Sequence, residues 1–226
     1  FRPYLTEEPA EFSVTVTKED IAFEQADLLE EAHRDGFKPR VFTDPFLERA
    51  AIQRAFAEFL FDFDILLFHG SAVALDGRGY LFTARSGTGK STHTRLWQQV
   101  LGPAAQVFND DKPALRFIDG KWYAYGTPWC GKDGININMK VSLAGICFLR
   151  QSKENAIRRL TAEEAAIRLL WQTPRFLDIE KMDSHVALVD KLACMIPVYE
   201  MENNMQPECI QLSFETMYRG AEEAGL

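Results

Sequence analysis

The stretch from residue 68 to residue 96 limits the choice of fold more than any other part of this chain. Two short apolar runs, Ser71–Leu75 and Tyr80–Thr83, are separated by a turn that contains Gly77 and Gly79. Glycines there favour the positive φ values of a tight hairpin. A glycine-rich segment follows, and the next residues have helical character. Strand, glycine loop and helix, in that order, are the context that a phosphate-binding loop requires.

The glycine-rich segment has the residue types that hold a nucleotide triphosphate. Glycines let successive backbone N–H groups point inward as an anion nest, and the helix that follows adds the partial positive charge of its N-terminus. Lys90 can reach the β- and γ-phosphates, and the Ser91 hydroxyl can ligate Mg²⁺. The first glycine of the usual motif is Ala84 here, which is small enough for a close exit from the strand. The alternative is a glycine-rich turn with a surface lysine. The predicted nucleotide-binding residues are Arg85, Ser86, Gly87, Thr88, Gly89, Lys90, Ser91 and Thr92.

Two adjacent carboxylates, Asp110 and Asp111, follow a brief strand predicted at 106–108. Such a pair is costly unless a cation or a proton lies between the two groups. In a nucleotide enzyme the cation is Mg²⁺ bridged to the phosphates, and the second carboxylate is then free to take a proton from an incoming hydroxyl. The alternative is an acidic loop, which is common in a chain of this charge.

Composition narrows the class of protein. A chain of 226 residues with 46% hydrophobic residues can bury one substantial core, so we expect a single α/β domain. The net charge of −8 argues against a nucleic-acid binder. We find no apolar run long enough to span a membrane and no signal segment. The four cysteines are scattered, which suits a reducing compartment and predicts a cytoplasmic protein.

The predicted domain comprises three parts: an N-terminal strand and helix extension (1–43), a nucleotide-binding core (44–150), and C-terminal strands and helices (151–226). Alternation of apolar and polar residues predicts a strand at 11–18. A capping box at Thr161 and Glu164 predicts the start of a helix that ends before Pro174. The further expected strands are 65–68, 113–118, 122–125, 141–149 and 198–201, and further helices are expected to begin near residues 44 and 183. Residues 20–34 are interpreted as a short strand followed by a helix, and residues 208–219 as either a helix or a strand followed by one.

Four other residues deserve an assignment. His69 stands at a strand end, where a histidine is either structural or, so close to the loop, in contact with the transferred phosphate. In the glycine-rich segment 126–134, Lys132 is a candidate contact to substrate or phosphate, and Trp129 a candidate packing surface. Cys130 has no evident base beside it and is interpreted as a bystander thiol.

The chain resembles the HPr serine kinase/phosphorylase family, and more distantly the ATP-dependent phosphoenolpyruvate carboxykinases that share its core fold. The resemblance rests on an ordered set: His69-Gly70, then SGTGKS at 86–91, then Asn109 with the two aspartates. It covers about residues 65–150. It is fairly specific, because in most P-loop ATPases no His-Gly strand leads through a hairpin to the phosphate loop. It implies an α/β fold with a P-loop-containing mixed β-sheet core flanked by helices.

The resemblance also implies residue roles. Lys90 would bind the phosphates, Ser91 and Asp110 would ligate Mg²⁺, Asp111 would be the general base, and His69 would lie beside the transferred phosphate. One departure is that residues 127–133 replace the acidic, arginine-containing signature of the family's kinases, with its metal-binding glutamate. A full-sized N-terminal domain is also lacking before the core. HPr as the substrate and the reverse phosphorylase activity therefore do not transfer.

We therefore expect an ATP- and Mg²⁺-dependent kinase, using ATP or another NTP, with a hydroxyl acceptor such as a protein or peptide serine. Its catalytic residues would be Asp111, Lys90 and His69. We expect no nucleic-acid or membrane partner and leave a homo-oligomer open. Three alternatives stay open: a non-catalytic nucleotide-sensing module, a carboxykinase-like enzyme, and, weakest, an interaction-only protein.

Overall fold

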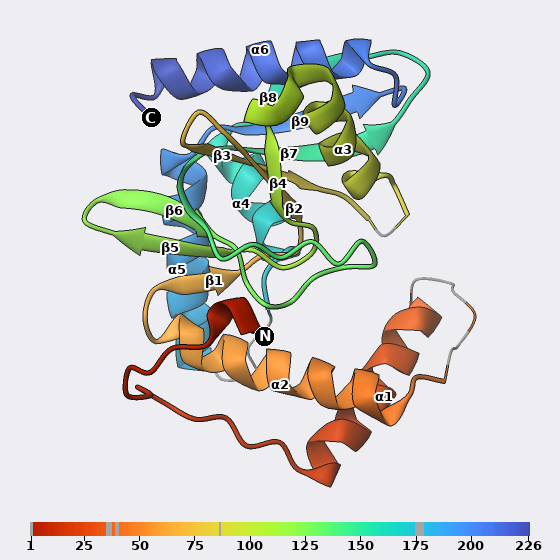
Figure 1. Cartoon of the computed structure of the whole chain (residues 1–226), viewed down its shortest axis with the longest axis vertical. Coiled ribbons are helices and arrows are strands. Elements are labelled where there is room, and N and C mark those ends of the chain that lie inside the picture. The colour runs from red at the N-terminus through yellow and green to blue at the C-terminus, as the bar shows by residue number, and fades with distance from the viewer. Residues whose placement is uncertain (1, 35–37, 39–40, 86, 175–178) are drawn as a thin grey trace. The chain divides into compact units, whose positions relative to one another are not determined.

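The structure is a computed structural model of the whole chain, and it describes all residues except 1, 35–37, 39–40, 86 and 175–178. The chain forms two compact units (Figure 1). One comprises residues 6–63, and the other comprises residues 1–5 together with 64–226. Residues 44–63, which we expected to belong with the core, therefore belong to the N-terminal unit.

The smaller unit consists of helices α1 (Lys18–Arg34) and α2 (Asp44–Phe61) and the segment before them. As expected, α2 begins at Asp44-Pro45, although the N-cap position is Thr43. Arg54 of α2 joins the two helices: it lies 2.5 Å from Glu24 and 3.2 Å from Asp20, both in α1. Its guanidinium also lies over the ring of Phe23.

The strand predicted at 11–18 is wrong, because residues 12–17 have no regular structure and α1 begins at Lys18. The alternation itself is real: Phe12, Val14 and Val16 are half-buried while the residues between them are exposed. Phe12 stacks on Phe59 with ring centroids 5.0 Å apart. The segment thus buries alternate side chains against a helix without a neighbouring strand. Without such a strand it has no hydrogen-bonding ladder.

The larger unit is built on a nine-stranded mixed sheet, counted over the described residues. The order along its main path is β1-β5-β6-β7-β3-β2-β4, with β9 added to β7 and β8 added to β9. The bounds are β1 Ile65–Leu67, β2 Ser71–Leu75, β3 Arg78–Thr83, β4 Gln106–Asn109, β5 Ala114–Ile118, β6 Lys121–Tyr125, β7 Lys140–Gln151, β8 Ala156–Arg159 and β9 Val198–Asn203.

Strand β7 organises this sheet. Along one edge it pairs in parallel with β3. Along its other edge its first residues pair antiparallel with β6, and residues 146–151 pair in parallel with β9. Its apolar run is buried on both faces, as expected for a strand covered by helices on both sides. Because β3, β7 and β9 run in parallel, their carboxyl ends meet at one edge of the sheet.

The predicted hairpin at 71–83 is confirmed, with β2 and β3 antiparallel. Asp76 and Gly77 have φ values of 52° and 78°, so the two central residues of the turn are left-handed. Gly79, which we expected to contribute to the turn, has a different role. A Cβ at this position would lie 2.7 Å from Cγ2 of Val141, so Gly79 allows β3 and β7 to approach each other.

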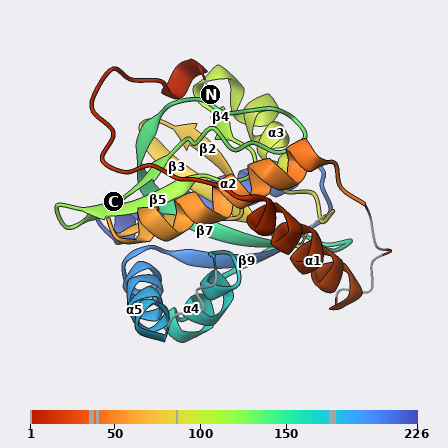
Figure 2. The same ribbon diagram turned by 90° about the horizontal axis from the view of Figure 1, so that it is seen from below.

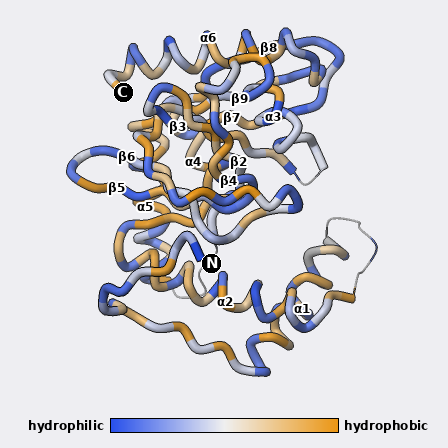
Figure 3. Tube along the Cα trace, viewed as in Figure 1, coloured by the Kyte–Doolittle hydropathy of each residue, from blue (hydrophilic) through white to orange (hydrophobic). Residues whose placement is uncertain are grey.

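Helices cover both faces of the sheet. α3 (Lys90–Leu101) and α6 (Glu208–Glu223) pack over one face, with Trp97 and Met217 in the core between them and the strands. Figure 2 shows α4 (Ala162–Leu170) and α5 (Ile179–Met195) together on one side of β9. The alternation of hydrophobic and hydrophilic residues along α6 in Figure 3 is that of a helix with one buried face.

Two helix predictions can be compared with the structure directly. The capping box of α4 is present, since the Thr161 side chain accepts from the Glu164 amide and the Glu164 side chain accepts from the Thr161 amide. Helix α5 includes residues from Ile179 on, four residues earlier than expected. Among the described helices, none combines the length and the apolar character that crossing a membrane requires.

Candidate functional site

The glycine loop lies where the parallel strands end. Strand β3 ends at Thr83 and α3 begins at Lys90, so the predicted order of strand, loop and helix is present. Gly87 and Gly89 have φ values of 81° and 108°, which L side chains rarely adopt. Ser86, one of the predicted nucleotide contacts, lies outside the described residues. Phosphate binding by this loop stays a prediction.

Lys90 points back across the loop. Its Nζ lies 3.0 Å from the carbonyl oxygen of Ala84, the small buried residue that replaces the first glycine of the motif. Burial lowers the pKa of Lys90, and Lys112 lowers it further, while Asp111 opposes both. The ammonium is thus held over the loop in an environment that favours an anionic partner.

The last residues of β7 and the turn after β9 contact the glycine loop. Gln151 Nε2 donates to the carbonyl oxygen of Thr88 at 3.2 Å. A Cβ on Gly89 would lie 2.6 Å from Cε of Met205, so the thioether lies directly against this glycine. Met205 itself has a left-handed backbone, with φ of 60°. The positive φ is what favours glycine at residue 89, and a side chain there would also have to displace the end of Met205.

The remaining loop residues differ in exposure. Ser91 is half-buried in the first turn of α3, whereas Arg85 and Thr92 are exposed. His93, in the first half of α3, is fully buried against the ring of Phe82. His93 is therefore part of the core beneath the loop.

Asn109 is the centre of the second region, which we call the acidic loop and which comprises residues 109–112 and 126–133, on either side of strands β5 and β6. It is fully buried and ends strand β4. Its Oδ1 accepts from the amides of Asp111 and Lys112 at 3.1 and 2.8 Å. Its Nδ2 donates to the carbonyl oxygens of Thr127 and Trp129, both at 3.1 Å. One side chain therefore connects the aspartate pair to the glycine-rich segment 126–134.

Asp110 is buried and faces that same segment. Its two carboxylate oxygens accept one backbone amide each, from Gly131 at 2.7 Å and from Asp133 at 3.1 Å. Burial raises the pKa of Asp110, and the two amides oppose the rise. Gly131 is required by space, because a Cβ there would lie 3.2 Å from Asp110 Oδ2. Asp110 thus holds the acidic loop in place.

Asp111 faces a different set of groups. Its Oδ1 lies 3.6 Å from His69 Nε2 and 3.6 Å from Lys112 Nζ. Its carbonyl oxygen accepts from the amide of Gly70 at 2.9 Å. With Lys90 acting on the same groups electrostatically, the structure brings together a carboxylate, an imidazole and two ammonium groups.

His69 is held by its backbone between strands. Its amide donates to the carbonyl oxygen of Gln172 at 2.7 Å, and its carbonyl oxygen accepts from the Thr83 hydroxyl at 2.8 Å. Burial, followed by Lys112 and Lys90, lowers the pKa of His69 to about 3. Because the pKa of His69 is lowered, the imidazole is neutral at neutral pH. It can then accept or donate one hydrogen bond at each nitrogen.

Three candidates from the glycine-rich segment are placed differently. Lys132 is exposed. Trp129 is 6% exposed, so it contributes to the core more than to an open packing surface. Cys130 is half-buried, and Asn136 Nδ2 lies 3.4 Å from its sulfur. Burial raises the pKa of the neighbouring Tyr4 to about 12, and Cys130 adds to the rise.

Two residues of the site were not assigned from the sequence. Lys112 was quoted with the aspartate pair but given no role, although its position beside Asp111 offered a signal. Gln172 is far away in the sequence, and its Oε1 lies 2.7 Å from the Thr83 hydroxyl. Nothing in the local sequence indicates that contact, because it depends on how α4 ends against the sheet.

The residues present fit a magnesium nucleotide. Among the described residues no three His, Cys, Asp or Glu side chains form a metal cluster. Mg²⁺ does not need one, since it usually takes one or two carboxylates together with phosphate oxygens and water. Each oxygen of Asp110 accepts a single amide and retains acceptor capacity. Asp110 and the Ser91 hydroxyl would hold the ion, which would neutralise phosphate charge.

Comparisons with known proteins add little to this geometry. No protein-family model and no curated protein matches the sequence. Among solved structures, the HPr(Ser) kinase/phosphatase from Coxiella burnetii is similar to this chain at 12% sequence identity and a TM-score of 0.41. The match covers 69% of this chain and 90% of that chain. A likeness this loose carries no argument about activity, so function has to be argued from the site itself.

Proposed function

We propose that this protein is an ATP- and Mg²⁺-dependent phosphotransferase that moves the γ-phosphate to a hydroxyl acceptor. The observation that carries the proposal is the group around Asp111, whose Oδ1 lies 3.6 Å from both His69 Nε2 and Lys112 Nζ, beside Lys90 and the glycine loop. A nucleotide-binding loop alone needs no such carboxylate. Transfer to a hydroxyl needs a group that takes the hydroxyl proton.

The donor side of the reaction is assigned to the glycine loop and Lys90. Backbone amides at the start of α3 would bind phosphate oxygens, and the ammonium of Lys90 would bind the β- and γ-phosphates. Lys112 would offset negative charge that develops on the transferred group. Catalysis of phosphoryl transfer is mostly positioning and charge neutralisation, which is what these groups can supply.

The acceptor side is assigned to Asp111 and His69. Asp111 would take the proton from the acceptor hydroxyl. His69, neutral because of its lowered pKa, would position the hydroxyl by a hydrogen bond and add no charge of its own.

The proposal is tested with γ-labelled ATP and an extract of cells that contain the protein, followed by identification of the labelled molecule. The Lys90→Ala and Asp111→Asn variants should each abolish the labelling. Matched controls are Lys121→Ala and Asp119→Asn, both in the exposed β5–β6 hairpin. Full labelling by either site variant would overturn the proposal.

A second candidate, a nucleotide-sensing module without turnover, is favoured by one observation. Both oxygens of Asp110, the expected metal ligand, already accept backbone amides. Titration with ATP distinguishes the two functions. Sensing predicts ATP affinity without product and without change in Asp111→Asn, whereas the phosphotransferase predicts product that the same variant loses.

A further inference from the structure

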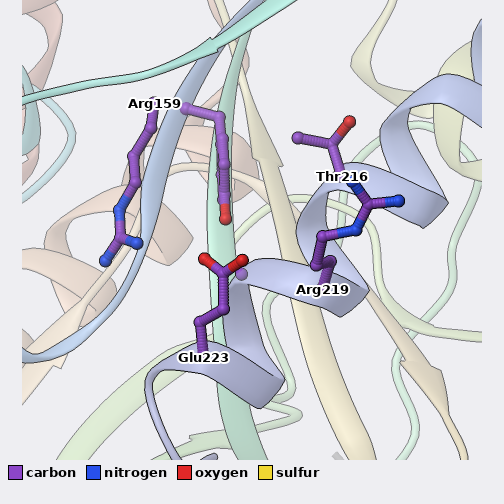
Figure 4. Close-up of a pocket in the computed structure, with 6 residues that line it drawn as sticks. Arg159, Thr216, Arg219 and Glu223 are labelled. Atoms are coloured by element: carbon purple, nitrogen blue, oxygen red, sulfur yellow. The ribbon is translucent and has the colours of Figure 1, made fainter.

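A pocket lies beside the C-terminal half of α6. Its volume is about 190 Å³, several times the roughly 30 Å³ of one water molecule in the liquid. The lining residues are Arg159, Tyr199, Thr216, Arg219, Gly220 and Glu223. In Figure 4 the Arg159 side chain comes from β8, while Thr216, Arg219 and Glu223 come from α6, and all four surround the same space.

The pocket is separate from the glycine loop. Met205, just before α6 begins, lies against Gly89, whereas the pocket residues of α6 belong to its last two turns. A 16-residue helix rises by roughly 24 Å. The argument for this pocket therefore does not depend on the function proposed above.

The charges that line the pocket are not matched by ion pairs. Within the described part of the chain, neither Arg159 nor Arg219 forms an ion pair, and neither does Glu223. The neighbouring charged residues are by contrast paired. Arg158 forms ion pairs with Glu164 and Glu200, and Glu222 forms one with Arg78. Two guanidinium groups and one carboxylate therefore belong to residues that line the pocket without an ion-pair partner in the described part of the chain.

Tyr199 supplies an independent observation at the pocket floor. Its side chain is 2% exposed, and its hydroxyl has no hydrogen-bond partner among the described residues. A Cβ on Gly220 would lie 1.7 Å from that hydroxyl oxygen, so only glycine admits the phenol. Both a glycine inside a helix and an unpartnered buried hydroxyl are unfavourable for the free protein.

The geometry points to a binding site for a small zwitterion of the α-amino-acid class. Arg159, Arg219 and the hydroxyls of Tyr199 and Thr216 are the donors that a carboxylate needs. Glu223 is the acceptor that an ammonium group needs. A plain anion such as propionate would leave the carboxylate of Glu223 without a partner, and a plain amine would leave the two guanidinium groups without one. A ligand that carries both a carboxylate and an ammonium group provides a partner for the arginines and for Glu223 at the same time.

The test is calorimetric titration of the full chain with each of the twenty common amino acids, together with propionate and ethylamine as single-charge probes. At least one amino acid should bind, and the two single-charge probes should not. Binding of propionate or ethylamine with equal affinity would overturn the proposal. So would the absence of binding by all twenty amino acids.

Variants connect binding to the pocket. Glu223→Gln and Arg219→Gln should each weaken binding of that amino acid at least about tenfold, the effect of one charged hydrogen bond. Tyr199→Phe should weaken binding while the free protein melts at the same or a higher temperature, because an unpartnered hydroxyl is removed. The controls Glu154→Gln and Arg150→Gln, exposed residues outside the pocket, should bind normally. Unchanged affinity in all three pocket variants would contradict the assignment.

Discussion

The two halves of the candidate site are held in very different ways: one is the glycine loop 84–89 and the other is the acidic loop, residues 109–112 and 126–133. The acidic loop is held by two buried side chains. Asn109 and Asp110 together form six hydrogen bonds with backbone groups of loop residues. The glycine loop is held by Gln151 and by packing against Met205, and Gly87 has no neighbour that a Cβ would touch.

This difference suggests a division of roles. A buried network of satisfied hydrogen bonds gives a single arrangement, so the position of Asp111 is set before any ligand arrives. Backbone amides at the start of a helix are instead left without partners until an anion binds. On this interpretation the acidic loop is preorganised, and the glycine loop is completed by the phosphates.

The largest expected effect separates chemistry from binding. Asp111→Asn should lower the rate of phosphotransfer by about 10²–10⁴-fold, because the general base is lost. Affinity for ATP, measured by titration, should change little, because the phosphates are assigned to the other loop. The Asp119→Asn control should keep both the rate of phosphotransfer and the affinity for ATP. A variant that loses ATP affinity as strongly as rate would contradict the division of roles.

Asn109→Ala tests the acidic loop as a network. Its removal leaves several buried backbone groups unpaired, so the free energy of unfolding should fall by about 3 kcal/mol or more. Chemical denaturation measures this loss. Asn138→Ala is the matched control, because Asn138 is exposed and donates one hydrogen bond, to Pro3. If the two variants were equally stable, the acidic loop would not be held by Asn109.

Gly87→Ala tests the glycine loop against a glycine elsewhere. Gly87 and Gly120 have φ values of 81° and 77°, and a Cβ at either position would meet nothing within 4 Å. Both alanine variants should therefore lose about 1–2 kcal/mol of stability through backbone strain alone. Only Gly87→Ala should weaken ATP binding, which calorimetry measures. Equal ATP affinity in both variants would show that the phosphates of ATP do not bind the glycine loop.

Acid should destabilise the core beneath the glycine loop. Burial lowers the pKa of His93 from 6.5 to about 3. Between these values the unfolded chain binds a proton that the folded chain does not. Stability should therefore fall as the pH falls through this window, by up to about 1.4 kcal/mol per pH unit for one histidine. His69 shifts in the same direction and adds to the slope.

Urea denaturation at several pH values measures this slope. His93→Gln should reduce the pH dependence of the free energy of unfolding by the contribution of one histidine. His33→Gln, at an exposed position of α1, should leave the pH dependence unchanged. A slope that His93→Gln leaves unchanged would place the acid sensitivity elsewhere.

Local patterns in the sequence predicted most of the elements that position the site. The hairpin at Asp76 and Gly77, the capping box at Thr161 and the buried run in β7 are all read from neighbouring residues, and all are present. The wrongly predicted strand at 11–18 has the right periodicity. Periodicity reports which side chains are buried, and only a neighbouring strand makes the segment part of a sheet.

What the sequence by itself determined is the set of chemical groups and the order in which the chain presents them: a strand, a glycine loop, a helix and an aspartate pair. Only the tertiary structure decided which aspartate faces which partners. Asp110 and Asp111 are adjacent, yet one accepts amides of loop 131–133 and the other faces His69 and Lys112. Successive side chains leave a strand end in different directions, and what each one meets depends on segments distant in the sequence.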